Sequence, residues 1–196
     1  GSDAASIQTR YQRQDDGFVI DGCKHWISFG NISDIFLVFA QSDENISAFI
    51  VERDMPGVST TAMTNVMAGR GSHLGKIKFD KVKVPKENRI GEDGFGFKFA
   101  MKTLSGGRIG IAAQALGIAS GAYELALNYS KQRKAFGTQI CNHQAIAFKL
   151  ADMATDIEAA RHMVMKAAWE KDQGINYDTS SAMAKLFASR IAMKHT

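Results

Sequence analysis

The sequence predicts an α+β protein in which a central antiparallel β-barrel or sandwich domain, residues 1–92, precedes an incomplete antiparallel α-helical bundle, residues 93–196. Both prolines, Pro56 and Pro85, fall in the first part, where strand-like runs alternate with turn residues. From about Phe95 onward there is no proline, and alanine, methionine and leucine recur at helical spacing. This change of pattern places the domain boundary.

The first strand-like stretch is "GFVIDGCKHWIS", residues 17–28. Two runs flank Asp21-Gly22, and this dipeptide favours a hairpin turn because both central positions of a type I′ turn need a positive φ. The next stretch, "DIFLVFA" (34–40), is continuously apolar. It predicts a strand covered on both faces.

Two further strands complete the predicted β domain. "ISAFIVE" (46–52) follows a polar loop and leads to a turn at Pro56-Gly57. In "GKIKFDKVKV" (75–84) the apolar alternation slips by one residue, which predicts a bulge at Asp80-Lys81. Pro85 ends this strand.

Apolar residues recur at i, i+3 and i+4 in residues 108–133 and 143–174, which predicts two long helices. Gly174 ends the second, and Asp178 with Ser180 begins a third. The third helix runs to Thr196 without a stop signal, so we expect the bundle to be incomplete.

Five glycines interrupt the first of these helices. Three of them are expected at close helix–helix contacts, and the pair Gly106-Gly107 next to Arg108 is expected where a ligand chain passes near the backbone. The three at contacts are Gly110, Gly117 and Gly121.

Composition is that of a folded globular protein, with 45% hydrophobic and 22% charged residues and a net charge of +4. No uninterrupted apolar run approaches the roughly 20 residues that cross a bilayer, so we expect no membrane insertion. Cys23 and Cys141 are expected to be free thiols in a reducing compartment. The histidines show no metal-ligand spacing, and no metal site is expected.

The one concentrated basic cluster is "KQRKAFG", residues 131–137. A short basic cluster is usually a solvated helix face, and the functional alternative is an anion site. If it binds an anion, a phosphate fits better than a nucleic acid, because no extended basic stripe accompanies it.

Other motifs are absent. "GEDGFGF" (91–97) lacks the spacing of a dinucleotide fingerprint, and there is no Walker sequence or nucleophile elbow.

Four segments in order resemble the acyl-CoA dehydrogenase family, and most closely its short-chain, butyryl-CoA-type members. They are "GSDAAS" (1–6), "GFVIDGCKHWISFG" (17–30), the long stretch from "GRGSHLG" to "KAFGTQI" (69–140), and "HQAIAFKLADMATDIEAAR" (143–161). The resemblance covers nearly all of the chain.

The resemblance implies an FAD-dependent oxidoreductase of fatty-acid β-oxidation. In this chemistry a carboxylate removes the α-proton of an acyl-CoA while the flavin takes the β-hydride, giving the trans-2-enoyl-CoA. An electron-transferring flavoprotein then reoxidises the flavin. The resemblance also implies a homotetramer or dimer, in the cytoplasm of a bacterium or the mitochondrial matrix of a eukaryote.

Six positions match residues that the family uses for FAD. Trp26 and Ile27 would pack against the flavin, and Ser28 would offer its hydroxyl near N5. At the adenine end, which the family completes from the neighbouring subunit, the resemblance implies Arg133 for the pyrophosphate, Phe136 for packing and Gln144 for a polar contact.

Four positions match substrate-binding residues of the family. Ser2 would touch the pantetheine arm and Leu104 would line the CoA channel. Arg108 would order the site around the thioester. Ser105 stands where many members carry an Asp that contacts CoA, so that contact is in doubt.

Two other departures are His73 for a small hydroxyl residue and Ala135 for another, the second of which could lose an FAD hydrogen bond. The position that carries the catalytic Glu in some members is Gly107, which cannot act as a base. Other members carry the Glu in a Y-E-G-T segment near the C-terminus, which does not occur in these 196 residues. We therefore expect no catalytic residue in this chain.

Two alternatives remain open at this stage. The fold could serve an acyl-CoA oxidase or a flavin monooxygenase, which would consume oxygen without an electron-transferring flavoprotein. The missing base also allows a non-catalytic binding module.

Overall fold

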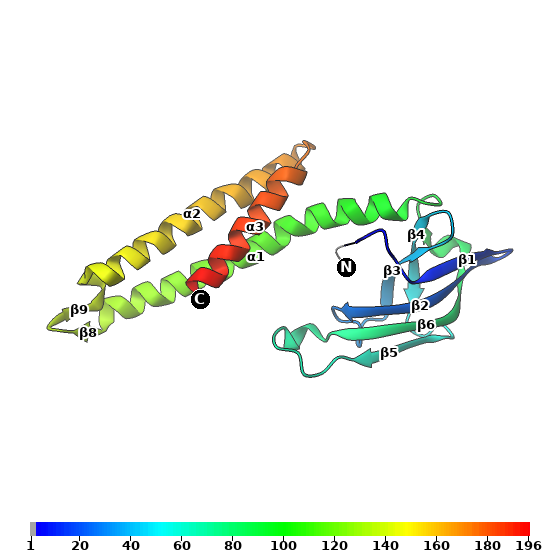
Figure 1. Ribbon diagram of the computed structural model, residues 1–196, viewed down its shortest axis with the longest axis horizontal. Helices are drawn as coiled ribbons and strands as arrows, with labels where there is room; N and C mark the ends of the chain where they lie inside the picture. Colours follow the sequence, from blue (N-terminus) through cyan, green and yellow to red (C-terminus); the bar gives the residue numbers. More distant parts are fainter. Residues whose placement is uncertain (1–2) are drawn as a thin grey trace. The chain divides into compact units, whose positions relative to one another are not determined.

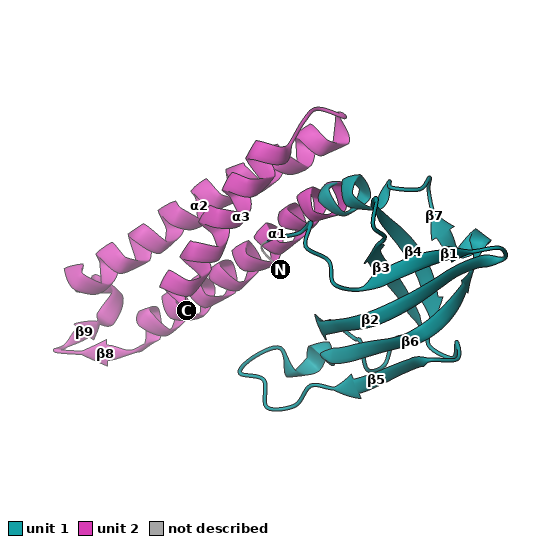
Figure 2. Cartoon of the chain, turned by 45° about the vertical axis from the view of Figure 1, so that its right-hand side comes forward, with its two compact units in different colours: residues 1–101 teal, residues 102–196 magenta. Residues whose placement is uncertain are grey.

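The computed structural model describes residues 3–196 (Figure 1). The chain divides into two compact units, residues 1–101 and 102–196, which Figure 2 shows in different colours. We call them the β unit and the helical unit. The α+β class predicted from the sequence is confirmed.

The β unit is built on one seven-stranded sheet in the order β5-β6-β2-β1-β3-β4-β7. Its two longest strands, β2 and β6, lie next to each other in both ribbon views (Figures 1 and 2). The bounds are β1 Arg10–Gln14, β2 Gly17–Ile27, β3 Ile35–Gln41, β4 Ile46–Glu52, β5 Val58–Ala62, β6 Gly75–Pro85 and β7 Arg89–Ile90.

The predicted antiparallel barrel or sandwich needs correction in its strand directions and closure. The sheet is mixed, because β1 pairs with β3 in parallel. Within residues 3–196 the sheet has open edges at β5 and β7, so it does not close into a barrel.

The predicted hairpin at Asp21-Gly22 is wrong. Strand β2 continues through both residues, and the chain reverses instead at Asp15-Asp16, between β1 and β2. Gly22 has φ 140°, and a Cβ there would lie 2.7 Å from the Cα of Thr9. The glycine is therefore required by a close approach of the neighbouring backbone.

Opposite Gly22 lies the bulge that the sequence predicted. The β2–β6 register shifts between Ile20 and Gly22, and Lys81 takes φ 50° on β6. The amide of Lys81 donates to the carboxylate of Asp21 at 3.3 Å. The bulge lets Phe79 and Val82 both point into the core although their spacing is odd.

The core of the β unit gathers around Phe49, which is fully buried and makes edge contacts with Tyr11 and Phe18 at centroid distances of 5.0 Å each. Strand β3 buries only one face of its apolar run. Ile35 and Leu37 are exposed, so the expectation that both faces are covered is wrong for the part of the chain described.

A polar cluster around Asp93 ties the segment after β7 to the sheet. The Tyr11 hydroxyl donates to Asp93 Oδ1 at 2.9 Å, and Ser47 Oγ donates to the same oxygen at 3.1 Å. Arg13 Nη2 lies 2.8 Å from Oδ2. Desolvation raises the pKa of Asp93, but these donors, with Asn45 and the charge of Arg13, outweigh it and hold the pKa below its ordinary value.

The Asp93 cluster predicts acid-sensitive stability. Because the folded pKa lies below the unfolded value, the stabilisation is complete above about pH 4–5 and is lost as the pH falls through the folded pKa. Asp93→Asn should lower the free energy of unfolding at pH 7 and flatten its decline toward pH 3. Urea unfolding at both pH values measures this, and Asp54→Asn is the control at an exposed acid. An unchanged pH slope in Asp93→Asn would contradict it.

The helical unit contains the greater part of α1 (Gly96–Gln132), followed by α2 (Gln144–Asp172) and α3 (Asp178–His195). A two-stranded hairpin of β8 (Lys134–Ala135) and β9 (Thr138–Gln139) joins α1 to α2. Gly174 takes φ 69° after α2, as its role as a helix stop predicts. The helices pack through small residues, among them Ala112, Ala119, Ala160, Ala167, Ala184 and Ala188, all fully buried.

The glycines of α1 do not lie where the sequence suggested. A Cβ at Gly107, Gly110, Gly117 or Gly121 would meet nothing within 4 Å. The alanine face of α1 makes the contacts to α2 and α3, and the glycines point elsewhere. The prediction that three of them mediate close helix contacts is wrong for the described residues.

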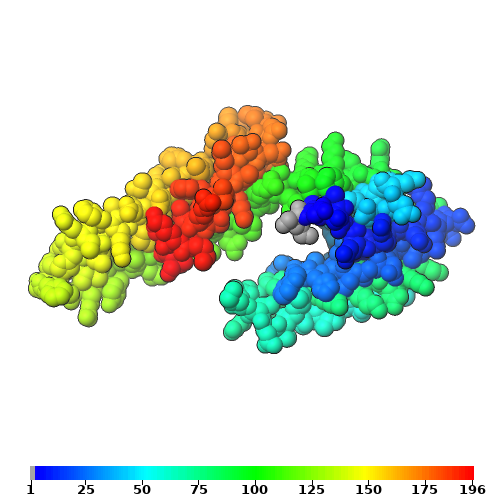
Figure 3. Space-filling model, in the orientation of Figure 1, coloured from blue at the N-terminus to red at the C-terminus, as the bar shows by residue number. Residues whose placement is uncertain are grey.

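A flank of α1 next to its alanine face is apolar and is not covered by residues 3–196. Leu104, Ile111, Ile118 and Leu125 recur every seven residues and are 51%, 51%, 51% and 75% exposed. By length and composition alone α1 could cross a membrane, which is weak evidence since core helices share these properties. Figure 3 shows α2 and α3, yellow to red, as neighbouring surfaces.

A second carboxylate joins α2 to α3. Asp156 Oδ2 accepts from Lys194 Nζ at 2.8 Å and lies 2.9 Å from His195 Nε2. The hydrogen bond from Lys194 is the main cause that holds the pKa of Asp156 below its ordinary value, against desolvation. The contacts of Asp156 with Lys194 and His195 hold the last turn of α3 against α2.

Candidate functional site

The end of β2 presents a large aromatic surface in a strained conformation. Trp26 takes φ 60° and is 64% exposed, and Phe29 takes φ 57° and is 49% exposed. Bulky residues avoid the left-handed region, and such strain is concentrated at functional sites. Exposed aromatics held in this way suit a flat ligand.

The turn that follows is fixed by the backbone. The amide of Phe29 donates to the carbonyl of Ser72 at 2.7 Å, and that of Gly30 donates to Ile27 at 3.0 Å. A Cβ at Gly30 would lie 2.9 Å from the Ile27 oxygen. A Cβ at Gly75 would lie 2.6 Å from the Asn31 nitrogen. The backbone segments thus approach each other too closely for any side chain.

Arg53 stabilises the turn after β2 by hydrogen bonds. No sequence pattern singled this residue out. Its Nε donates to the carbonyl of Ser33 at 2.6 Å, and its Nη1 donates to Thr60 Oγ1 at 3.0 Å. The guanidinium also lies over the Phe36 ring, 5.7 Å from its centroid. No local pattern marks this role, because the partners are far apart in sequence.

Ile27 and Ser28 belong to the same turn, next to the backbone contacts of Phe29 and Gly30. Ser28 is exposed, while Ile27 is half-buried and packs against the β core. Among residues 3–196 the buried Asn31 Oδ1 has no hydrogen-bond partner. An exposed aromatic, an exposed hydroxyl and an unpaired acceptor in one turn fit a planar cofactor with polar edges, as a flavin is.

Lys24 approaches the same end of β2. Its ammonium donates to the carbonyl of Phe39 at 2.7 Å. Burial lowers its pKa, since desolvation disfavours the charged form. The contact joins β2 to β3 beside the turn.

The predicted substrate-binding residues of the helical unit share one stretch of α1. Ser105 is buried, and Arg108 Nη1 donates to its Oγ at 3.5 Å. Leu104 is half-exposed, and a Cβ at Gly107 would meet open space. The backbone near Gly107 is therefore accessible, and the passage of a ligand there stays a prediction. Ser2 lies outside the described residues.

The predicted adenine-end residues gather at the β8–β9 hairpin. Phe136 is 97% exposed with φ 52°, and Gly137 has φ 80°, the two positive φ values of a type I′ turn. The amide of Ile140 donates to the carbonyl of Arg133 at 2.9 Å and closes the hairpin. The Phe136 ring makes an edge contact with His143 at 6.1 Å, and His143 directly precedes Gln144.

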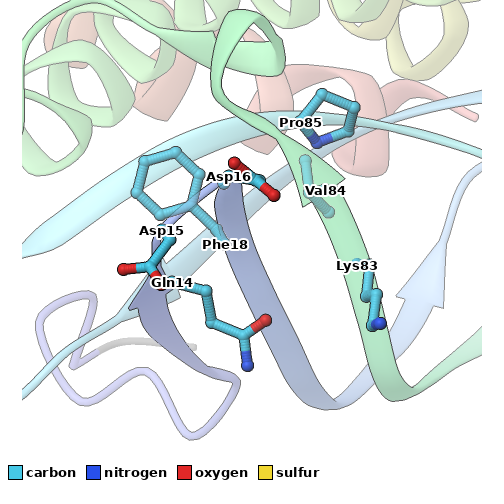
Figure 4. Close-up of a pocket in the computed structure, with 8 residues that line it drawn as sticks. Gln14, Asp15, Asp16, Phe18, Lys83, Val84 and Pro85 are labelled. Carbon is cyan, nitrogen blue, oxygen red and sulfur yellow. The ribbon is translucent and has the colours of Figure 1, made fainter.

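One clear pocket of the β unit contains none of the predicted residues. It has a volume of about 590 Å³ and is lined by Gln14–Phe18 and Lys83–Pro85 (Figure 4). The pocket lies at the start of β2, whereas Trp26 lies near the end of that strand. In an extended strand the two positions are about 30 Å apart. The aromatic surface formed by Trp26 and Phe29 is open within the β unit.

Comparison with known proteins gives matches along the whole chain. Residues 1–82 match the family model for the acyl-CoA dehydrogenase middle domain, and residues 94–196 match that for the C-terminal domain. The short-chain specific acyl-CoA dehydrogenase of Megasphaera elsdenii is 46% identical over 202 residues, covering 100% of this chain and 53% of the relative. The chain spans about half the length of the curated relatives it matches.

Solved structures agree. The butyryl-CoA dehydrogenase structure from Megasphaera elsdenii has a TM-score of 0.95 at 46% identity, covering 99% of this chain and 52% of that chain. A chain of a structure described as the electron transferring flavoprotein of Acidaminococcus fermentans has a TM-score of 0.95 at 47% identity, with 99% and 52% covered.

Proposed function

The chain belongs to the acyl-CoA dehydrogenase family, and from this premise we propose that the protein is an FAD-dependent oxidoreductase that converts a short-chain acyl-CoA to its trans-2-enoyl-CoA. The observation that carries the proposal is the strained, exposed Trp26 followed by the exposed Ser28. We place the domain boundary between residues 92 and 93.

In this proposal the turn after β2 holds the flavin. Trp26 and Ile27 provide an apolar wall, and Ser28 donates its hydroxyl to the cofactor edge. When bound, FAD supplies the two-electron oxidation that removal of two hydrogens from the substrate requires. The wall also excludes water from the reacting bond, since apolar side chains offer water no hydrogen bonds.

The β8–β9 hairpin holds the other end of the cofactor. Arg133 is exposed and can pair with a pyrophosphate, and Phe136 can cover an adenine with almost its whole ring. Gln144 adds a polar contact at the start of α2. Because the family completes this site across subunits, we propose a homotetramer or dimer, and the uncovered stripe on α1 supports an oligomer.

The start of α1 contacts the acyl-CoA. Leu104 lines the CoA channel, and Arg108, steadied by Ser105, orders the thioester. Ser2 touches the pantetheine arm. Gly107 has no side chain to act as a base, so the proton-abstracting carboxylate is not supplied by that position. We propose an electron-transferring flavoprotein as the electron acceptor. The bacterial cytoplasm or the mitochondrial matrix is the proposed location.

Anaerobic spectroscopy of the complete protein tests this function. We expect a flavin absorbance spectrum that bleaches on addition of butyryl-CoA and recovers with an electron-transferring flavoprotein. Recovery with oxygen alone at a comparable rate would instead favour an acyl-CoA oxidase. Purified protein that binds no flavin under any condition would contradict the proposal.

Ser28→Ala tests the polar contact within this site. Removing one hydroxyl donor to the cofactor should weaken flavin binding or slow its reduction about fivefold to tenfold, the equivalent of one hydrogen bond. The unfolding midpoint should not change, because Ser28 is exposed. Flavin titration and stopped-flow reduction measure the two effects, and Ser59→Ala is the control at an exposed strand position. Impaired folding, with normal flavin affinity in the fraction that does fold, would assign Ser28 to the core instead.

A further inference from the structure

One solvent-facing side of the β unit combines a thiol with basic side chains. On β2, Cys23 pairs with Lys78 of β6 in the antiparallel register. Lys76 and Lys78 are exposed, whereas Ile77 and Phe79 between and beside them are buried. Side chains of paired residues share a face, so the Cys23 thiol lies on the solvent side of the sheet.

The thiol lines a surface pocket of about 590 Å³ and lies beside a histidine ring nitrogen and the Lys24 carbonyl, 3.9 Å from Sγ. Cys23 Sγ lies 3.4 Å from His25 Nε2, which is two residues along the same strand and on the same face. The pocket is also lined by Gln8, Asp21, Gly22, Lys76, Lys78, Phe79 and Asp80. Cys23 is half-buried and His25 is exposed, so a small molecule can reach both.

The pocket lining carries two lysines and two aspartates, and the two lysines differ in whether they are paired. Lys78 Nζ lies 3.6 Å from Asp80 Oδ2, and the Asp21 carboxylate accepts the amide of Lys81. Lys76 forms no ion pair with any residue in the described range 3–196. Its ammonium is thus available to a carboxylate of a bound molecule.

We propose that Cys23 is a site of reversible mixed-disulfide formation with small disulfides that carry carboxylates, of which oxidised glutathione is the representative. The Cys23 thiol gives its proton to His25 Nε2, and the thiolate attacks one sulfur of the disulfide. A bond forms between Cys23 Sγ and that sulfur, and the original S–S bond breaks. The departing thiolate takes the proton from His25.

The exchange needs no other reactant. The Cys23 sulfur is oxidised and the departing sulfur is reduced, so the disulfide supplies both the new partner and the oxidising equivalents. Lys76 orients the incoming carboxylate, and an excess of reduced thiol reverses the reaction. The inference does not depend on the proposed dehydrogenase activity.

Peptide-level mass spectrometry of the complete protein, treated with oxidised glutathione, tests the proposal. Cys141 is the internal control, since it is also a free, half-buried thiol but has Asn142 rather than a histidine beside it. We expect Cys23 to be modified at least about tenfold faster than Cys141. His25→Gln should remove most of this difference.

Lys76→Gln separates charge recognition from simple exposure. It should slow the reaction of Cys23 with oxidised glutathione about threefold, the effect of one exposed charge, and leave its reaction with the cationic disulfide cystamine no slower. Near-ultraviolet circular dichroism confirms that both variants are folded. Equal rates at Cys23 and Cys141, or the same slowing by Lys76→Gln with both probes, would overturn the proposal.

Discussion

Trp26→Ala is expected to weaken FAD binding about thirtyfold in the complete protein while leaving it folded. The Trp26 side chain is 64% exposed, so roughly 160 Å² of a side chain of about 250 Å² is available to a ligand. If a flavin covers about half of that surface, the lost burial amounts to about 2 kcal/mol at 25 cal/mol per Å². This corresponds to about thirtyfold in Kd. Flavin fluorescence titration measures the change.

Trp26→Gly tests whether the backbone is strained at this position. Glycine adopts φ 60° without the cost of about 1 kcal/mol that alanine bears there. The glycine variant should therefore be more stable than the alanine variant by about that amount, whereas both should bind flavin equally weakly. At an exposed position with a negative φ, a glycine variant is instead less stable than the alanine variant.

Phe29 is the matched control for Trp26. It also has a positive φ and an exposed ring, but the resemblance assigns it no flavin contact. Phe29→Gly should likewise be more stable than Phe29→Ala, with much less effect on flavin affinity. Unchanged flavin affinity in both Trp26 variants would remove Trp26 from the proposed site and leave its strain unexplained.

Phe49→Ala is expected to lower the free energy of unfolding of the β unit by about 3–5 kcal/mol. The ring is fully buried and lies at the centre of the aromatic cluster with Tyr11 and Phe18. Its removal loses apolar burial and leaves a cavity that rigid strands on either side cannot fill. Because domains of this size have only about 5–15 kcal/mol of stability, the expected loss is a large share of the total.

Urea unfolding followed by circular dichroism measures the loss at Phe49. Phe97→Ala is the control, since that ring is 40% exposed, and it should cost no more than about 1 kcal/mol. A comparable loss in both variants would show that Phe49 is not the centre of the core. The Asp93 network predicts in addition that the loss at Phe49 is nearly the same at pH 5 and pH 7, because both lie above the carboxylate's transition.

Membership of the acyl-CoA dehydrogenase family is shown by the match of both domains, and the α+β class by the fold. The roles of Trp26 and Ser28 stay predictions that the variants above test, and the roles of Arg133 and Arg108 also stay predictions. The structure adds that three residues of the adenine-end set, Arg133, Phe136 and Gln144, lie at one hairpin and the helix that follows it.

The sequence by itself determined the elements that depend on near neighbours. Apolar spacing predicted the long helices, Gly174 marked the end of α2, and the slip in alternation located the bulge at Asp80-Lys81. Such features are set by contacts within a few residues, so periodicity records them. The order of the four matching segments likewise pointed to the acyl-CoA dehydrogenase family without any knowledge of the fold.

Only the tertiary structure decided which segments meet. It replaced the hairpin at Asp21-Gly22 by a continuous strand because Thr9 needs the space above Gly22, and it turned the glycines of α1 away from the other helices. It also brought Arg53 to the turn after β2 and gave Asp93 its partners on β1 and β4. These contacts join residues far apart in sequence, and their free energy exists only once strand register and chain reversal bring the groups together.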